Sequence, residues 1–340
     1  MRSPIIFGRS EVDFLPLDPT STSHLYFPLG THMALLTPEE VLSRIQNGQS
    51  LQGAELSRID LQGAHLDGAQ SIEAYLRGAN LSGASCRQTD FSRATLMFAQ
   101  LCEASLVGAN LSEAELNSAN LENADLREAN ASGATLYGVN LSRVQGTSAR
   151  FDRADFREAR AEAANFSNAN LERANFSQTH FSQSNFSGAN LHQASFAEAH
   201  LDGSLWLHAN LERAIFVGAI LENVDFSKAD AIAADFRNVR IVGAIATEAE
   251  FLEANLSQSR IENADLTGAS LFAANLEGAT LSAIDLTKAN LQDANLEQTT
   301  WESANFSGSN VAGAVFTGAV GLTDAQKQWL RENGAVNVPR

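Results

Sequence analysis

Histidines, cysteines and glycine loops are the features of this sequence that could do chemistry, but their spacing does not match a metal site, a phosphate-binding loop or a catalytic set. His180 and His200 lie twenty residues apart, but two imidazoles alone make a weak metal site, because zinc sites use three or four protein ligands. Gly63 and Gly68 are not followed by the Gly-Lys-Ser/Thr of a phosphate-binding loop. No Ser/His/Asp or Cys/His set can be assembled. We therefore predict no catalytic, metal-binding or cofactor-binding residues, no cofactor, and no enzyme activity.

A five-residue repeat determines where every side chain must lie. From Leu51 to Phe316 there are 54 repeat centres, and 48 of them are Leu, Phe, Ile, Val, Trp or Cys. The residue two positions before a centre is usually Ala, and the residue just before it is most often Asn or Asp. A period of five matches neither an α-helix (3.6) nor a strand (2.0). Such units bury their apolar pair only by stacking on copies of themselves, which predicts a solenoid. Any pair of carboxylates on its flat faces is expected to be solvated and to lack the burial that retunes a pKa for acid–base catalysis.

The units Ala109-Asn110-Leu111-Ser112-Glu113 and Ala264-Asp265-Leu266-Thr267-Gly268 resemble those of pentapeptide-repeat proteins. The resemblance covers about 270 of the 340 residues. It implies an all-β fold, a right-handed quadrilateral β-helix with four pentapeptides to each coil of 20 residues, or about 13.5 coils and roughly 65 Å. One set of centres supports this coil independently, because its members are spaced by twenty and would stack as a ladder: Phe156, Phe176, Phe196, Phe216 and Phe236.

Short helices are expected at both ends, where open coil edges would otherwise join rod to rod. Thr37-Pro38-Glu39-Glu40 is a capping box before apolar Val41, Leu42 and Ile45, with a stop at Gly48. Thr323-Asp324-Ala325-Gln326 opens a second helix with Trp329 and Leu330, closing at Gly334. The expected segments are an arm (1–34), an N-terminal capping helix (35–50), the solenoid (51–320) and a C-terminal capping helix and tail (321–340).

Composition narrows the cellular setting. No apolar run is long enough to span a membrane, and no secretory signal is visible. Cys86 is an inward centre and Cys102 an outward residue, so no disulfide is expected. These features favour a cytoplasmic protein, and the resemblance favours a bacterial source. In the family some terminal elements mediate dimers, so a monomer and a homodimer formed through a terminal cap both remain open.

Residues 1–34 lack the repeat but contain Phe7, Phe14, Tyr26 and Phe27. Three interpretations stay open: a flexible arm, a segment that orders on a partner, and a true start of translation at Met33.

The acidic surface raises the possibility of DNA mimicry. Residues 51–320 carry 33 acids and 17 bases, a net charge of −16. The resemblance implies that some such rods occupy the DNA site of type II topoisomerases and confer quinolone resistance. Duplex DNA 65 Å long would carry roughly 38 negative charges, well above the number here. A DNA mimic that inhibits or protects DNA gyrase is therefore the alternative function, and direct nucleic-acid binding is not expected.

The favoured function is a rigid scaffold for protein partners of unknown identity. Ile232, Leu252 and Phe272 are spaced by twenty and would form an apolar line on one outer face. A second group, Leu205, Leu207 and Ile245, is expected on the adjacent face. Contiguous apolar residues on a polar surface often mark an interface, so these six are the candidate partner-binding residues.

Overall fold

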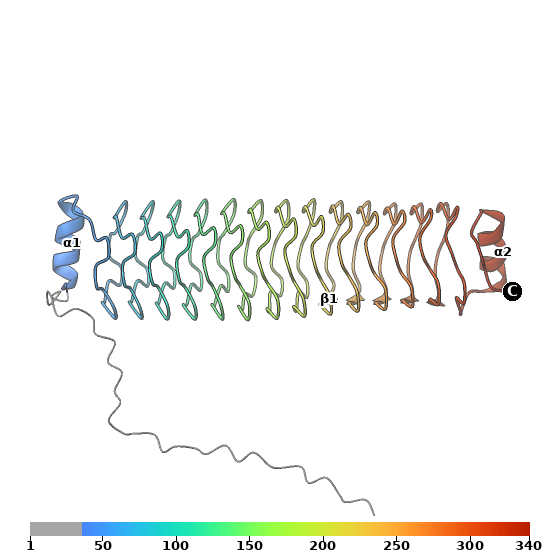
Figure 1. Ribbon diagram of the computed structural model, residues 1–340, viewed down its shortest axis with the longest axis horizontal. Coiled ribbons are helices and arrows are strands. Elements are labelled where there is room, and N and C mark those ends of the chain that lie inside the picture. The colour runs from blue at the N-terminus through green and yellow to red at the C-terminus, as the bar shows by residue number, and fades with distance from the viewer. Residues whose placement is uncertain (1–35) are drawn as a thin grey trace, which may run out of the picture. The chain divides into compact units, whose positions relative to one another are not determined.

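The computed structural model describes residues 36–340; the predictions for residues 1–34, including a start at Met33, lie outside the described residues. Between Glu55 and Val320, residues that precede a repeat centre pair in parallel with the residue twenty positions further along. The described chain is thus a parallel β-solenoid with four pentapeptides to a coil, as the resemblance implies (Figure 1). We name its four faces by consecutive centres. Face A contains Leu81, face B Cys86, face C Phe91 and face D Leu96, and each face includes every unit that lies a multiple of twenty residues from these centres.

Regular strands form on face A in the C-terminal half. They are β1 (Ile220–Glu222), β2 (Arg240–Val242), β3 (Arg260–Glu262), β4 (Thr280–Ser282) and β5 (Thr300–Glu302). All are parallel and ordered β1-β2-β3-β4-β5, with Leu221 opposite Ile241. Elsewhere on the solenoid the pairing is by single bridges, because the corners interrupt the extended backbone after each centre.

Most corners are hydrogen-bonded turns, and these restrict the second residue after each centre. In the first unit the Ala54 amide donates to the Leu51 carbonyl at 3.0 Å, and Gly53 has φ +62°. Positive φ at this position is the requirement of a type II turn. Many coils use Glu, Gln, Arg or Asn there instead of Gly. None uses Val, Ile or Thr, because β-branched residues fit the left-handed region poorly.

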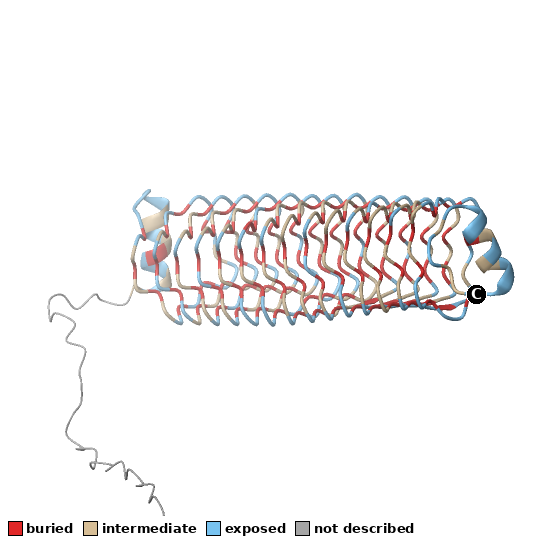
Figure 2. Ribbon diagram, turned by 45° about the vertical axis from the view of Figure 1, so that its right-hand side comes forward, coloured by how far each residue is buried: buried red, intermediate tan, exposed pale blue. Residues whose placement is uncertain are grey.

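The core is a stack of repeat centres, with the small residues two positions before them (Figure 2). The predicted ladder is confirmed: Phe156 and Phe176 stack with ring centroids 4.5 Å apart, and Phe216 and Phe236 with centroids 4.7 Å apart. A second ladder on face B runs through Phe186 and Trp206, at 4.4 Å. Where Ser or Thr replaces the small Ala, the buried hydroxyl donates a hydrogen bond to a backbone carbonyl. Ser204 Oγ, for example, donates to the Leu201 carbonyl at 2.5 Å. The interior therefore has few unsatisfied polar groups.

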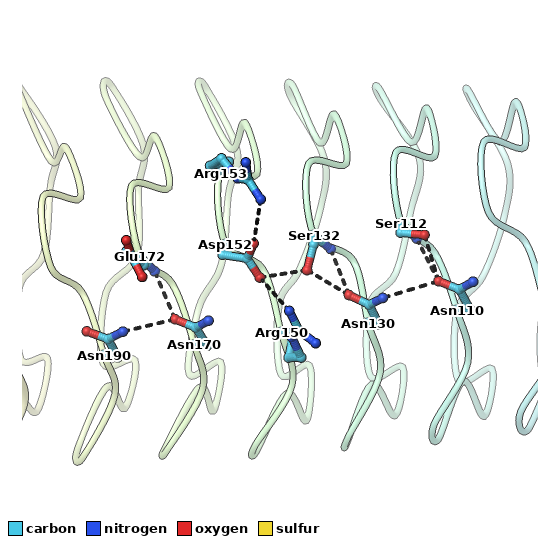
Figure 3. Close-up of polar contacts among 10 residues, drawn as sticks. All are labelled: Asn110, Ser112, Asn130, Ser132, Arg150, Asp152, Arg153, Asn170, Glu172 and Asn190. Carbon is cyan, nitrogen blue, oxygen red and sulfur yellow. Dashed lines mark hydrogen bonds and ion pairs between the residues drawn. The ribbon is translucent and has the colours of Figure 1, made fainter.

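Asparagine ladders run along the outside and hold neighbouring coils together. The Asn190 side-chain amide donates to Asn170 Oδ1 at 3.1 Å, while Asn190 Oδ1 accepts from the backbone amide two residues on. The same two bonds recur at Asn130, with Asn110 as the acceptor (Figure 3). Asn and Asp precede the centres because their side chains satisfy the backbone of the corner that follows.

Helices α1 (Pro38–Gln46) and α2 (Asp324–Glu332) lie at the two ends of the solenoid (Figure 1). Both begin with a capping box, at Thr37 and Thr323. The glycine just beyond each C-cap, Gly48 and Gly334, has a positive φ that suits helix termination.

Apolar side chains of both helices face the ends of the core. Val41 and Leu330 are fully buried, and these partly buried residues contact the core beside them: Leu42, Ile45 and Trp329. Gln326 of α2 donates to the Ala304 carbonyl at 2.8 Å. We propose that residues 35–50 and 321–340 act as caps that keep one rod from adding to the next.

Candidate functional site

The predicted line of Ile232, Leu252 and Phe272, here called the apolar column, occupies successive coils of face C. The Ala233 amide donates to the Leu252 carbonyl at 2.8 Å, and the Glu253 amide donates to the Phe272 carbonyl at 2.9 Å. These backbone bonds fix the three side chains one above another. Each is the first residue after a buried centre and is half-buried. The column is therefore a continuous apolar strip over three coils, held at the inter-strand spacing of about 4.8 Å.

Acidic residues border the apolar column on both sides. Asp230 and Glu250 lie on one side, in the row that precedes the centres, and Glu253 lies on the other, next to Leu252. Asp230 Oδ1 accepts the Ile232 amide at 3.2 Å. Between residues 230 and 293, the outward positions of face C hold no Lys or Arg. This surface presents apolar side chains within a negative field.

The second predicted group, on face B, is divided in two. Leu205 and Ile245 belong to the same row, but Asp225 lies between them and pairs with both. Leu205 and Ile245 are the more exposed residues of the group, and Leu207 is half-buried. The group is thus two separate apolar spots that border the face of the apolar column.

Sequence reasoning missed several exposed apolar residues. Ile215 is as exposed as Leu205, and face D carries exposed Tyr75, Phe98 and Tyr137. The signal that could have found them was available, because each is a large apolar residue in an outward position of the repeat.

Comparison with known proteins identifies the repeat. Profiles described as "Pentapeptide repeats" match in several overlapping copies within residues 72–160 and 234–300, and one described as "Pentapeptide repeat region" matches residues 159–236. The chain belongs to the pentapeptide repeat family. No curated protein matches it in sequence.

Solved structures of other pentapeptide repeat proteins resemble the solenoid. One is HetL, involved in heterocyst differentiation regulation in the cyanobacterium Nostoc sp. strain PCC 7120. The two sequences are 26% identical over an alignment that covers 83% of this chain and 97% of HetL, with a TM-score of 0.27. Another is QnrB1, a plasmid-mediated fluoroquinolone resistance protein: 21% identity, 54% of this chain, 92% of that chain and a TM-score of 0.41. A third is from the Arabidopsis thaliana thylakoid lumen: 31% identity, 37% of this chain, 78% of that chain and a TM-score of 0.15.

The environments of His180 and Cys86 in this pentapeptide repeat protein shift their pKa values. His180 and His200 stack with ring centroids 4.6 Å apart. Burial lowers the pKa of His180, and nearby His200 and Arg160 lower it further. Burial raises the pKa of the Cys86 thiol to about 12, which makes it a poor nucleophile. Among residues 36–340, no three His, Cys, Asp or Glu side chains are grouped to hold a metal ion.

The most enclosed carboxylate, Asp152, fills a break in an asparagine ladder (Figure 3). Arg150 replaces the asparagine expected in that row. Asp152 instead accepts from Ser132 Oγ at 2.6 Å and pairs with Arg150 at 3.5 Å and Arg153 at 3.4 Å. Burial alone would raise the pKa of Asp152, but the Ser132 hydrogen bond and the two guanidinium groups hold it below its ordinary value. The group is a satisfied structural ion pair.

Neither helix within residues 36–340 has the length and apolar character needed to span a lipid bilayer.

Proposed function

We propose that this pentapeptide repeat protein is a non-enzymatic scaffold that binds protein partners through the apolar column. The observation that carries the proposal is the continuity of Ile232, Leu252 and Phe272 over three coils, together with the absence of bases from the same stretch of face C. The partner that fits is a protein surface with apolar side chains between basic ones, because its cations would face the acidic border.

The column can supply a useful share of binding energy. At most about a third of each side chain is exposed, so full cover by a partner contributes roughly 0.5–1 kcal/mol per side chain, or about 2 kcal/mol for the three. That corresponds to roughly thirtyfold in affinity. The backbone that carries them is already fixed by the hydrogen bonds between coils, so no backbone segment has to be ordered when a partner covers them.

The alternative, a DNA mimic that binds DNA gyrase, is less well supported by the charge distribution. Acidic residues outnumber basic ones on all four faces rather than on one. Many are also neutralised locally, as Asp125 is by Arg127 (2.6 Å) and Asp155 is by Arg157 (2.7 Å). The dense negative charge of duplex DNA is therefore not reproduced by the solenoid.

Affinity capture with the full-length chain tests the proposal. Leu252→Asp/Phe272→Asp removes two members of the apolar column. Ser92→Asp/Ser112→Asp adds the same charge to the same row of face C, far from the column. We expect a discrete partner that is retained by the wild type and by this control, and lost with the column variant. Purified partner should then bind the column variant at least tenfold more weakly, because two of the three side chains are lost.

Equal binding to all three chains would contradict the proposal. Recovery of DNA gyrase or topoisomerase IV by all three chains would favour the DNA-mimic alternative.

A further inference from the structure

A second surface, on face D near the N-terminal end, combines exposed aromatic and cationic side chains. We call it the arginine–aromatic cluster; it consists of Arg58, Tyr75, Arg77, Met97 and Phe98. Tyr75 is 51% exposed and Phe98 is 46% exposed. The Arg77 guanidinium carbon lies 4.7 Å from the centre of the Phe98 ring, and Arg77 Nη1 lies 3.7 Å from Met97 Sδ. The Arg58 amide donates to the Arg77 carbonyl at 2.9 Å, so the two arginines occupy adjacent coils.

Phe98 is a large apolar residue at a repeat position that elsewhere holds glycine, alanine or polar residues. It is the second residue after its centre, with φ +60°. No other Phe, Tyr or Trp occupies this position between residues 53 and 318. A non-glycine residue in the left-handed region costs about 1 kcal/mol. The same left-handed conformation recurs at this position in most units, so the feature that sets Phe98 apart is its large, exposed ring.

The two arginines of the cluster are unpaired, unlike most others on the solenoid. Within the described residues neither Arg58 nor Arg77 has a carboxylate oxygen within 4.0 Å. The nearby acids are engaged elsewhere: Glu73 pairs with Arg93 at 2.8 Å, and Glu55 accepts the Ser57 amide at 2.9 Å. On an otherwise acidic rod, the Arg77 guanidinium therefore lies against the exposed Phe98 ring without a carboxylate partner, with Arg58 on the adjacent coil.

We propose that the arginine–aromatic cluster is a second docking site, which binds an acidic segment of a partner protein that carries an aromatic side chain between its carboxylates. Guanidinium groups bind carboxylates through paired, charge-assisted hydrogen bonds. Tyr75 and Phe98 offer faces and edges on which a partner ring can pack. Tyr, Phe, Met and Arg are also the residue types enriched at the centres of protein interfaces.

This site goes beyond the proposed function, because it lies on another face and selects the opposite charge. Phe98 is nearly eight coils from Leu252 of the apolar column, or roughly 37 Å along the solenoid. Occupation of both sites would hold a basic and an acidic partner at a fixed separation.

Selection from a random peptide-display library on the immobilised full-length chain tests the site. Selected peptides are then titrated by fluorescence anisotropy against the wild type, Phe98→Gly, Arg58→Gln/Arg77→Gln, and a control on the same face, Tyr137→Thr. We expect acidic peptides with an aromatic residue, bound at least tenfold more weakly by the first two variants and unchanged by the control. Phe98→Gly should melt at or above the wild-type temperature, because glycine suits φ +60°.

Two results would overturn the proposal: selection of no acidic peptide whose binding depends on Phe98, or a marked fall in the melting temperature of Phe98→Gly. The latter would show that Phe98 serves the fold. Basic peptides that the selection also yields are assigned to the apolar column if Leu252→Asp/Phe272→Asp abolishes their binding, so the two sites are tested separately.

Discussion

Gly146 is the one glycine among the repeat centres, and replacing it by alanine tests how tightly the aromatic core is packed. A Cβ atom at this position would lie 2.9 Å from Phe166 Cδ1, 3.1 Å from Phe166 Cε1 and 3.3 Å from the Asn165 carbonyl oxygen. The Phe166 ring cannot easily move away. Phe186 stacks on it with centroids 5.7 Å apart, and Phe151 meets it edge-on at 5.6 Å.

Two opposing effects determine the magnitude. Overpacking a well-filled core costs about 1–3 kcal/mol. Replacing Gly by Ala restricts the unfolded chain and returns about 0.4–1 kcal/mol. We therefore expect Gly146→Ala to lower the free energy of unfolding by about 1–2 kcal/mol.

Chemical denaturation of the full-length chain measures this effect, with Gly146→Ala, Phe166→Leu and the double variant in a mutant cycle. The leucine side chain of the Phe166→Leu variant is smaller and should accept the new methyl group, which gives a favourable coupling of about 1 kcal/mol. A single Gly146→Ala variant as stable as the wild type, or a cycle with no coupling, would refute the packing argument.

Three further predictions concern packing, the ladders and pH. A cavity of about 20 Å³ lies at the Ala246 centre, so Ala246→Val should raise the free energy of unfolding by about 0.5–1 kcal/mol in chemical denaturation; a lower value would show that the added methyl groups clash. Asn190 bridges Asn170 and Asn210, so Asn190→Ala should lower the free energy of unfolding by about 2 kcal/mol, and Asn190→Asp, which keeps the acceptor, by less in the same assay. The pKa of folded His180 lies below its ordinary value of 6.5, so its stabilising contribution is complete above pH 6.5 and is lost as the pH falls through the folded pKa. Melting temperatures between pH 6.5 and 5 should therefore fall less for His180→Gln than for the wild type, and parallel pH profiles would contradict this.

The repeat made the interior of this protein predictable. A strict period of five places each centre inward, and the spacing of Phe156 and Phe176 by twenty already indicates the length of one coil. Capping boxes are local signals, so Thr37 and Thr323 could be located from sequence alone.

The arrangement of surface side chains was harder to predict, because it depends on which residues lie on the neighbouring coils in the same row. Asp225 separates Leu205 from Ile245, and this could be seen only by following the row residue by residue. The contacts of Arg77 with Phe98 and Met97 depend on side-chain conformations that spacing does not specify. The change from bridges to strands β1–β5 on face A depends on the geometry of the corners, which the pentapeptide pattern leaves open.

A photo-crosslinking residue at position 252 tests the central claim, that the apolar column binds protein, most directly. The same residue at position 92, in the same row but far from the column, serves as the control. In cells of the source organism we predict discrete protein adducts from position 252 that disappear when Phe272→Asp is added, and none of these adducts from position 92. The same adducts from both positions, or no adduct from position 252, would contradict the claim.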